Sequence, residues 1–375
     1  SFDCSFAIKT CSIHPLSLAN LIKLPFITSG LSPTATWIPH FNIPPFLAGK
    51  IISTVHDIYP ALSGSIPVRI ASRGYLNLVK RRASLVIFVS QFTAREFRDK
   101  IGKSRGVEKV IHEGANGAQG SGLVAGHSAA RICDHEYFLY VGNIRENKNI
   151  GLLIAAFVRA SSSVTHSLVL IGRGNPVEHL SGIPDHIARR IHFTGFISDD
   201  RLPGAYANAT AFIFPSKYEG FGLPVLEAMA CGCPVIACNT SSIPEVGGEA
   251  VLYIEPDDVD GLTAALQTVQ DPAVRDRLVA AGLIQARQFS WKQMANTVSD
   301  ALMQVVRSPL PVSPDVDLLS RVLPCLSAYQ QTPTAATLTD LRQARQQLAE
   351  RWLTLDPIRC NLAIVGRWGR LSRCC

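Results

Sequence analysis

Long apolar runs are missing from this sequence. No stretch approaches the roughly 18 consecutive apolar residues that a membrane-spanning helix needs. The N-terminus also lacks the basic and then apolar order of a secretion signal. We therefore expect a cytoplasmic protein, and the sequence leaves open a peripheral contact with the inner face of a membrane.

Metal-binding spacing of cysteine and histidine is missing as well. The ten cysteines lie at irregular positions, with no Cys-x-x-Cys pair and no histidine at ligand spacing. Cys231 and Cys233 flank a glycine between an apolar helix and a strand, and we interpret them as small core residues of a reduced protein. The sequence therefore predicts neither a bound metal nor a cofactor.

The positive charge is too dispersed for a nucleic-acid-binding protein. The 36 basic and 29 acidic residues give a net charge of +7, which favours small phosphate-bearing ligands as partners and argues against nucleic acid. Loose basic clusters occur at 69–82 and 95–109. Each cluster is either an ordinary solvated face or a contact with an anionic membrane surface or substrate.

Length and apolar content favour two globular domains. A chain of 375 residues with 47% hydrophobic residues can build two cores, in units of about 150 residues each. Residues 114–134 are rich in Gly, Ala, Ser, Asn and His without an apolar period, which predicts a linker. We expect an N-terminal domain at 1–128, a second domain at 129–305, and a tail at 306–375 that is either a satellite helix or a non-native extension.

Short apolar runs alternate with amphipathic helical patterns along the chain. Apolar or β-branched runs that end in polar turns predict strands at 51–55, 85–89, 137–141, 167–171, 211–214 and 234–237. Helices are expected at 90–97, 149–160, 223–231 and around 262–269, with Ser90 as the N-cap of the first. Repeated strand–helix units predict an α/β fold with parallel sheets, which bind ligands outside the carboxyl ends of their strands.

Residues 215–230, Pro-Ser-Lys-Tyr-Glu-Gly-Phe-Gly-Leu-Pro-Val-Leu-Glu-Ala-Met-Ala, carry the strongest local signal. A buried strand ends, a loop with two glycines follows, and a helix begins with Pro224 in its first turn. Free amides at a helix N-terminus bind anions, and glycines allow a ligand to approach the backbone closely. Glu219 and Glu227 stand eight positions apart, so one can face a sugar while the other reaches a ribose. The alternative is that Glu219 is a capping group and that Glu227 is a solvent-exposed carboxylate.

Residues 140–149, Tyr-Val-Gly-Asn-Ile-Arg-Glu-Asn-Lys-Asn, form a second strand-to-helix loop, which carries two cations. Lys148 stands directly before a helix N-terminus, which is unfavourable for the helix dipole unless an anion lies there too. A diphosphate satisfies this requirement, and a surface ion pair is the alternative.

The Glu219 to Glu227 spacing resembles the Glu-x7-Glu signature of glycosyltransferase family 4. Segments 232–236 and 241–246 are similar to the family's next strand and loop, and the resemblance covers about residues 35–300. It implies the GT-B fold, in which two Rossmann-like domains face each other across a cleft. It also implies that Glu219 lies beside the donor sugar and that Glu227 binds the nucleotide ribose. The resemblance places four further loop residues at the donor: Gly220, Phe221, Gly222 and Leu223.

The same resemblance assigns the second loop to the donor diphosphate. In the family this loop supplies a lysine, and Lys148 occupies its place. Many members also have an arginine directly after the Val-Gly, where this chain has Asn143. Arg145 is the candidate substitute.

Three N-terminal segments, 37–45, 54–58 and 89–92, resemble family members of the mannosyl- or rhamnosyltransferase kind. His56 follows a buried strand, where the family often has a histidine near the transferred sugar. The alternative is a structural histidine whose hydrogen bonds are all made within the protein. We include His56 and Asp57 with Glu219 as candidate catalytic residues.

The family's first strand and glycine-rich loop are not found before Phe41. The expectation is that roughly the first strand–loop–helix unit of the N-terminal domain is absent.

The resemblance implies that the chain transfers a hexose from a nucleoside-diphosphate sugar with retention at the anomeric carbon. GDP-mannose is the first choice of donor, and a glycan or lipid-linked molecule is the expected acceptor. Lys148, Arg145 and helix amides would neutralise the leaving diphosphate without a metal. The incomplete N-terminal domain favours the alternative of a truncated, inactive nucleotide-sugar-binding protein. A Rossmann dehydrogenase or epimerase is weaker, because no three-glycine fingerprint is present.

Overall fold

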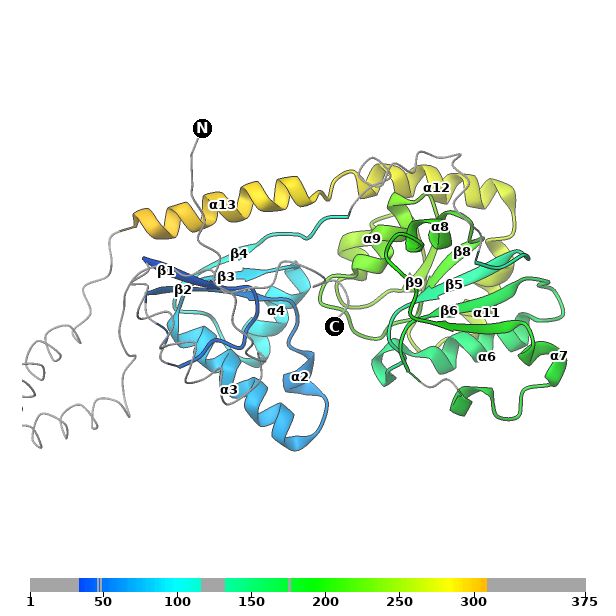
Figure 1. Cartoon of the computed structure of the whole chain (residues 1–375), viewed down its shortest axis with the longest axis horizontal. Coiled ribbons are helices and arrows are strands. Elements are labelled where there is room, and N and C mark those ends of the chain that lie inside the picture. The colour runs from blue at the N-terminus through cyan, green and yellow to red at the C-terminus, as the bar shows by residue number, and fades with distance from the viewer. Residues whose placement is uncertain (1–33, 46, 48, 116–131, 175–176, 309–375) are drawn as a thin grey trace, which may run out of the picture.

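The computed structural model describes residues 34–45, 47, 49–115, 132–174 and 177–308. Within these ranges the chain forms two parallel β-sheets with helices packed on them, seen as two lobes in Figure 1. The predicted α/β fold is therefore confirmed. Almost all of the predicted tail, and most of the predicted linker, lie outside the described residues, and the domain bounds stay a prediction.

The first sheet is parallel and has the strand order β1-β2-β3-β4. Its strands are β1 (Ala35–Ile38), β2 (Lys50–Val55), β3 (Ala83–Phe88) and β4 (Val107–Val110). The helices of this lobe are α2 (Tyr59–Leu62), α3 (Ile66–Arg82) and α4 (Gln91–Lys100). Strand β1, before Phe41, was not among the predicted strands, and the expected absence of the family's first strand–loop–helix unit stays a prediction. The sequence of β1, Ala-Thr-Trp-Ile, is interrupted by a threonine and is not a continuous apolar run.

The second sheet is also parallel and has the order β10-β9-β8-β5-β6-β7. Its strands are β5 (Tyr137–Val141), β6 (Ser167–Ile171), β7 (Ile191–Gly195), β8 (Ala211–Phe214), β9 (Val235–Cys238) and β10 (Val251–Ile254). Three of the predicted strands, 137–141, 167–171 and 211–214, are confirmed residue for residue. They were detectable because a strand covered on both faces is apolar along its whole length.

The strand order of the second sheet is the doubly wound one of a Rossmann domain. The chain enters at β5, builds outward through β6 to β7, and then crosses back to β8 beside β5. The helical segments of this lobe are η1 (Glu146–Lys148), α6 (Ile150–Ala160), η2 (Val177–Leu180), α7 (Asp185–Ala188), α8 (Leu202–Ala207), α9 (Leu223–Ala230), α10 (Ile243–Gly247), α11 (Val259–Thr268) and α12 (Pro272–Ala286). The order reverses between β5 and β8, and sheets of this kind bind ligands beyond the carboxyl ends of the strands at such a reversal.

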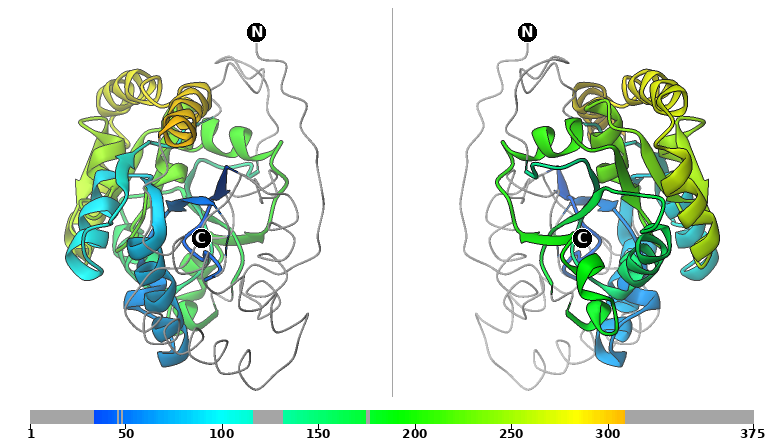
Figure 2. Two further views of the ribbon diagram at one scale, coloured as in Figure 1. Left: turned by 90° about the vertical axis from the view of Figure 1, so that its left-hand side faces the viewer. Right: turned by 90° about the vertical axis from the view of Figure 1, so that its right-hand side faces the viewer.

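Helix α13 (Trp291–Arg307) returns from the second lobe to the first. Its buried residues Val298, Ala301 and Val305 pack on the first sheet, and Figures 1 and 2 show α13 on the face opposite α3. Lys50, at the start of β2, donates from Nζ to the carbonyls of Val305 and Ser308 at 2.5 Å each. A cation at the C-terminal end of a helix is stabilised by the helix dipole, so this contact anchors α13 to the sheet.

Packing of α6 on the second sheet can be tested with a matched pair of isoleucines. Ile154 of α6 is 3% exposed, whereas Ile284 of α12 is 65% exposed. Ile154→Ala should lower the free energy of unfolding by about 2–5 kcal/mol, because it leaves a cavity in the core. Ile284→Ala should change it by less than about 0.5 kcal/mol. Chemical denaturation measures both, and equal losses would contradict the burial of α6.

Candidate active site

Two loops face each other at the carboxyl edge of the second sheet, where its strand order reverses. One follows β5 (residues 142–148) and the other follows β8 (residues 215–222). The carbonyl of Asn147 accepts hydrogen bonds from the Lys217 amide at 2.8 Å and the Ser216 hydroxyl at 3.1 Å. The two loops that were predicted to bind the donor are therefore joined to each other.

Lys148 and Glu219 form an ion pair across these loops. The Nζ to Oε1 distance is 2.5 Å, and the two side chains are 8% and 11% exposed. The Phe214 ring lies 5.6 Å from the Lys148 Nζ. Lys148 does form an ion pair, as the alternative had it, but the pair is buried and does not lie at the surface. Burial removes both charges from water at a cost in desolvation, which their mutual attraction offsets only in a well-held geometry.

Two serines hold the loop that carries Glu219. The Ser241 hydroxyl accepts the Glu219 amide at 3.0 Å. The Ser242 hydroxyl donates to the carbonyls of Glu219 at 2.9 Å and Phe221 at 2.8 Å. Sequence analysis gave these serines no role, since two serines between a strand and a helix are typical of an ordinary turn.

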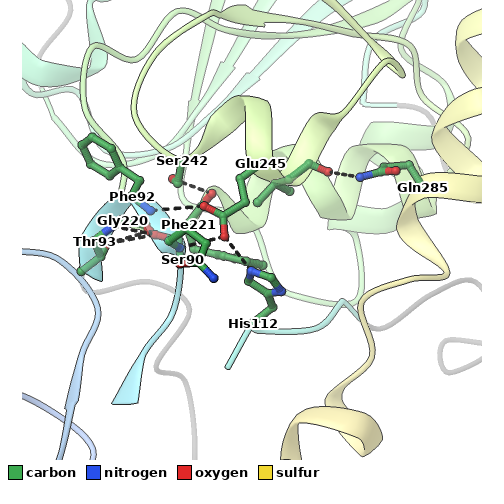
Figure 3. Close-up of polar contacts among 11 residues, drawn as sticks. Ser90, Phe92, Thr93, His112, Gly220, Phe221, Ser242, Glu245 and Gln285 are labelled. Atoms are coloured by element: carbon green, nitrogen blue, oxygen red, sulfur yellow. Dashed lines mark hydrogen bonds and ion pairs between the residues drawn. The ribbon is translucent and has the colours of Figure 1, made fainter. Parts of the chain in front are cut away.

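Gly220 brings the loop against the first lobe. A Cβ at this position would lie 1.9 Å from the carbonyl oxygen of His56, so no other residue fits without a shift of backbone. The Gly220 carbonyl accepts hydrogen bonds from the hydroxyls of Ser90 at 2.6 Å and Thr93 at 3.0 Å (Figure 3). We expected the glycine to admit a ligand. The structure shows that it admits the backbone of the other lobe, and its approach to a ligand stays a prediction.

His56 lies between two acceptors in the first lobe. Its Nδ1 is 3.1 Å from a carboxylate oxygen of Glu113, and its Nε2 is 3.2 Å from the carbonyl of Pro39. A carbonyl accepts only, so Nε2 carries a proton, and the Glu113 carboxylate favours a second one on Nδ1. Burial lowers the pKa of His56, but Glu113 and Pro39 outweigh it and raise the pKa above its ordinary value. The imidazolium form therefore fits this position.

Asp57 lies between His56 and the ion pair of the second lobe. Its Oδ1 accepts the Tyr59 amide at 2.8 Å. Burial raises the pKa of Asp57, and so does the negative charge of Glu219, while the Tyr59 amide and the charges of His56 and Lys148 oppose the shift. The structure thus brings the candidates His56, Asp57, Lys148 and Glu219 into one cluster.

The remaining candidates line the same edge of the second sheet. Arg145 is exposed and makes no ion pair with any described residue. The Asn143 carbonyl accepts a hydrogen bond from the Tyr140 hydroxyl at 3.1 Å. Glu227, inside α9, accepts a hydrogen bond from the Tyr206 hydroxyl at 3.2 Å.

The other loop candidates lie where α9 begins. Gly222 is the N-cap residue of α9 with φ +106°, a conformation that favours glycine. Leu223 is half-buried, and the side chain of Phe221 is buried against the ring of His112. Phe221 therefore packs between the lobes, and its ring does not face solvent.

Sequence analysis missed Glu113 and Tyr206. Glu113 follows the short strand β4, whose Val-Glu-Lys-Val sequence has no apolar run. Tyr206 lies in a helix of 6 residues and looks like any core aromatic. Each residue acquires its role only through a contact with a candidate that is distant in sequence.

No group of three or more His, Cys, Asp or Glu in the described part of the chain is placed to hold a metal ion. No helix there is both long and apolar enough to span a membrane.

The charge state of His56 can be tested through the pH dependence of stability. Its pKa in the folded protein is raised above the ordinary 6.5, so its contribution to stability is fully present below that value and is lost as pH rises through the folded pKa. Glu113→Gln should remove most of the contribution. The stability difference between wild type and Glu113→Gln should therefore shrink from about pH 5 to about pH 9, measured by denaturant unfolding. A difference that grows with pH would contradict the imidazolium assignment.

Parts of the chain are similar in sequence to known glycosyltransferases. A family model described as glycosyl transferases group 1 matches residues 135–271. O-antigen chain mannosyltransferase B of Escherichia coli is 41% identical over 171 residues, or 44% of this chain and 45% of that protein. Serotype-specific mannosyltransferase WbdA of Escherichia coli is 29% identical over 295 residues, or 72% of this chain and 35% of that protein. The chain thus spans less than half the length of these relatives.

Solved structures share the fold. Sucrose-phosphate synthase from Thermosynechococcus elongatus aligns with a TM-score of 0.59 at 22% identity, covering 72% of this chain and 73% of that one. Anabaena HepE, in complex with UDP, aligns with a TM-score of 0.55 at 18% identity, covering 68% and 72%. Residues 135–271 are thus similar to the group 1 glycosyl transferases, and the chain shares its two-lobed α/β fold with solved glycosyltransferase structures.

Proposed function

We propose that the chain transfers mannose from a nucleoside-diphosphate sugar to a glycan or lipid-linked acceptor with retention at the anomeric carbon. The buried Lys148–Glu219 pair, at the reversal of strand order and beside Asp57 of the other lobe, carries the proposal. Mannose is the first choice because the two Escherichia coli relatives are named as mannosyltransferases. The name of one of them suggests O-antigen polysaccharide as the acceptor class.

The donor would bind with its diphosphate between the two loops of the second lobe. Lys148 and the exposed Arg145 supply positive charge, and the Leu223 amide, at the first position of α9, has no partner within the helix. Glu227, oriented by the Tyr206 hydroxyl, would accept hydrogen bonds from the ribose hydroxyls. These cations and dipoles stabilise the charge that develops on the leaving diphosphate, which lowers the barrier to its departure without recourse to a metal ion.

The reaction would replace one bond at the anomeric carbon by another on the same face. An acceptor hydroxyl oxygen forms the new bond to the anomeric carbon. At the same time the bond between the anomeric carbon and the diphosphate oxygen breaks. The bonding electrons leave with the diphosphate, which also takes the proton of the acceptor hydroxyl. Glu219 would balance the positive charge that develops on the sugar, and Asp57 and the His56 imidazolium would orient the hydroxyls of the sugar.

Donor binding and transfer can be separated with substitutions in the two loops. Lys148→Ala should weaken GDP binding about 10- to 100-fold, because it removes a charged partner of the diphosphate. Glu219→Gln should leave GDP affinity within about 3-fold and lower the transfer of mannose from GDP-mannose about 100-fold or more. Calorimetric titration with GDP and UDP, without added metal, measures binding, and release of GDP or UDP from the corresponding sugars measures transfer.

Lys217→Ala is the matched control, because Lys217 lies in the neighbouring loop, which also carries Glu219, but pairs with the exposed Asp257. Equal losses in Lys148→Ala and Lys217→Ala would contradict the diphosphate site. Tight binding of a nucleotide by wild type, with no transfer from any sugar nucleotide, would favour the inactive binding protein instead.

We also propose that the N-terminal half of α3 contacts an anionic membrane surface. Ile66, Val68 and Ile70 are 69%, 47% and 66% exposed, which places three large apolar side chains in water on one short stretch. Residues 58–95 contain no acidic residue and six basic ones, namely Arg69, Arg73, Lys80, Arg81, Arg82 and Arg95. Exposed apolar side chains among cations fit the interface of an anionic bilayer. This contact would bring the first lobe to a lipid-linked acceptor.

Membrane contact is tested by cosedimentation with phosphatidylcholine vesicles, with and without phosphatidylglycerol. The wild-type chain should bind only the anionic vesicles, and the double substitution Ile66→Ser and Ile70→Ser should weaken binding about 10-fold or more, since apolar burial is lost. Ile284→Ser is the matched control, because this exposed isoleucine lies in the other lobe. Equal binding by all three proteins would contradict the role of α3.

A further inference from the structure

Glu245 of α10, in the second lobe, contacts the beginning of α4, in the first lobe. Its Oε1 accepts the Gln91 amide at 2.8 Å, and its Oε2 lies 3.3 Å from the Phe92 amide (Figure 3). The first amides of a helix lack partners within the helix, and the dipole there favours a negative charge. Ser90 already caps the Thr93 amide from within the first lobe. Helix α4 is therefore capped by both lobes at once.

His112 connects Glu245 to the loop that carries Glu219. Its Nε2 lies 2.7 Å from Oε1 of Glu245, and its ring stacks on that of Phe221 with the centroids 6.0 Å apart. Phe289, between α12 and α13, packs edge-on against both rings, at 5.5 Å from His112 and 5.9 Å from Phe221. The His112 side chain thus connects Glu245 to Phe221, in the loop that carries Glu219.

The same turn of α4 also binds the site loop directly. The hydroxyls of Ser90 and Thr93 donate to the Gly220 carbonyl, while Ser242, just before α10, donates to the carbonyls of Glu219 and Phe221. The loop at 219–222 is therefore held from one side by α4 and from the other by the residues that begin α10. Glu245 is the residue of α10 that joins these two supports.

We propose that Glu245 is a positioning residue, which fixes the start of α4 to the second lobe and so holds Glu219 opposite the His56–Asp57 turn. For its effect on turnover this inference rests on the function proposed above. The contact itself does not, because it consists of hydrogen bonds between the lobes.

Several groups keep Glu245 in its charged form. The carboxylate is 18% exposed, and burial raises its pKa, but the hydrogen bonds from His112, Gln91 and Phe92 outweigh burial and lower the pKa below its ordinary value. A neutral amide at this position would lose the charge and would direct its own N–H groups at the donors of α4. Glu245→Gln is therefore the informative substitution.

Hydrogen exchange on the full chain tests the contact without any assay of activity. In Glu245→Gln, the backbone amides at the start of α4 should exchange about 10-fold faster than in wild type, because their acceptor is weakened. Glu249→Gln is the matched control, since this exposed carboxylate lies four positions further along and should leave exchange unchanged. His112→Asn, at a position that is 39% exposed, should give a smaller increase and guards against a folding defect in the first variant. Unchanged exchange at α4 in Glu245→Gln would overturn the inference.

Turnover tests the positioning role. Glu245→Gln should lower kcat for mannose transfer from GDP-mannose about 10- to 100-fold while GDP affinity stays within about 3-fold, because the diphosphate binds to the second lobe alone. Faster exchange with an unchanged kcat would overturn the positioning role. A wild-type chain that transfers no sugar would contradict the proposed function, and the exchange result would still decide whether Glu245 joins the lobes.

Discussion

The reversal of strand order between β5 and β8 is the constraint on which the rest of the site depends. Two parallel strands lie side by side there, and the chain leaves them in opposite directions. The loops that follow carry Lys148 and Glu219, which are 71 positions apart in sequence and 2.5 Å apart in space. An ion pair this buried is costly unless the backbone holds both partners in place. The Asn147 carbonyl and the two serines before α10 provide that support.

The second lobe supplies only part of the site, and Gly220 decides how the first lobe completes it. Its missing side chain lets the loop touch the carbonyl of His56, and α4 binds its carbonyl through Ser90 and Thr93. Because these contacts involve backbone atoms, they fix the position of Glu219 more firmly than side-chain contacts alone would. The candidate catalytic residues of the two lobes face each other for this reason.

Charges of alternating sign run through this junction. Glu113 pairs with His56, Asp57 lies next in order, and Lys148 and Glu219 follow from the second lobe. Each charge is partly withdrawn from water, so each depends on its neighbours for compensation. The proposed sugar transfer would give such a network a use, since the reaction creates positive charge on the sugar and negative charge on the leaving diphosphate.

The sequence by itself determined the features that depend on local pattern. Strands covered on both faces show as apolar runs, Ser90 shows as a helix cap, and the spacing of Glu219 and Glu227 shows as a signature within one loop and helix. The tertiary structure alone decided that β1 pairs with β2, that Glu113 orients His56, and that Glu245 caps a helix 154 positions away. No local period encodes such contacts, because they form only when the two sheets and their connections bring distant residues together.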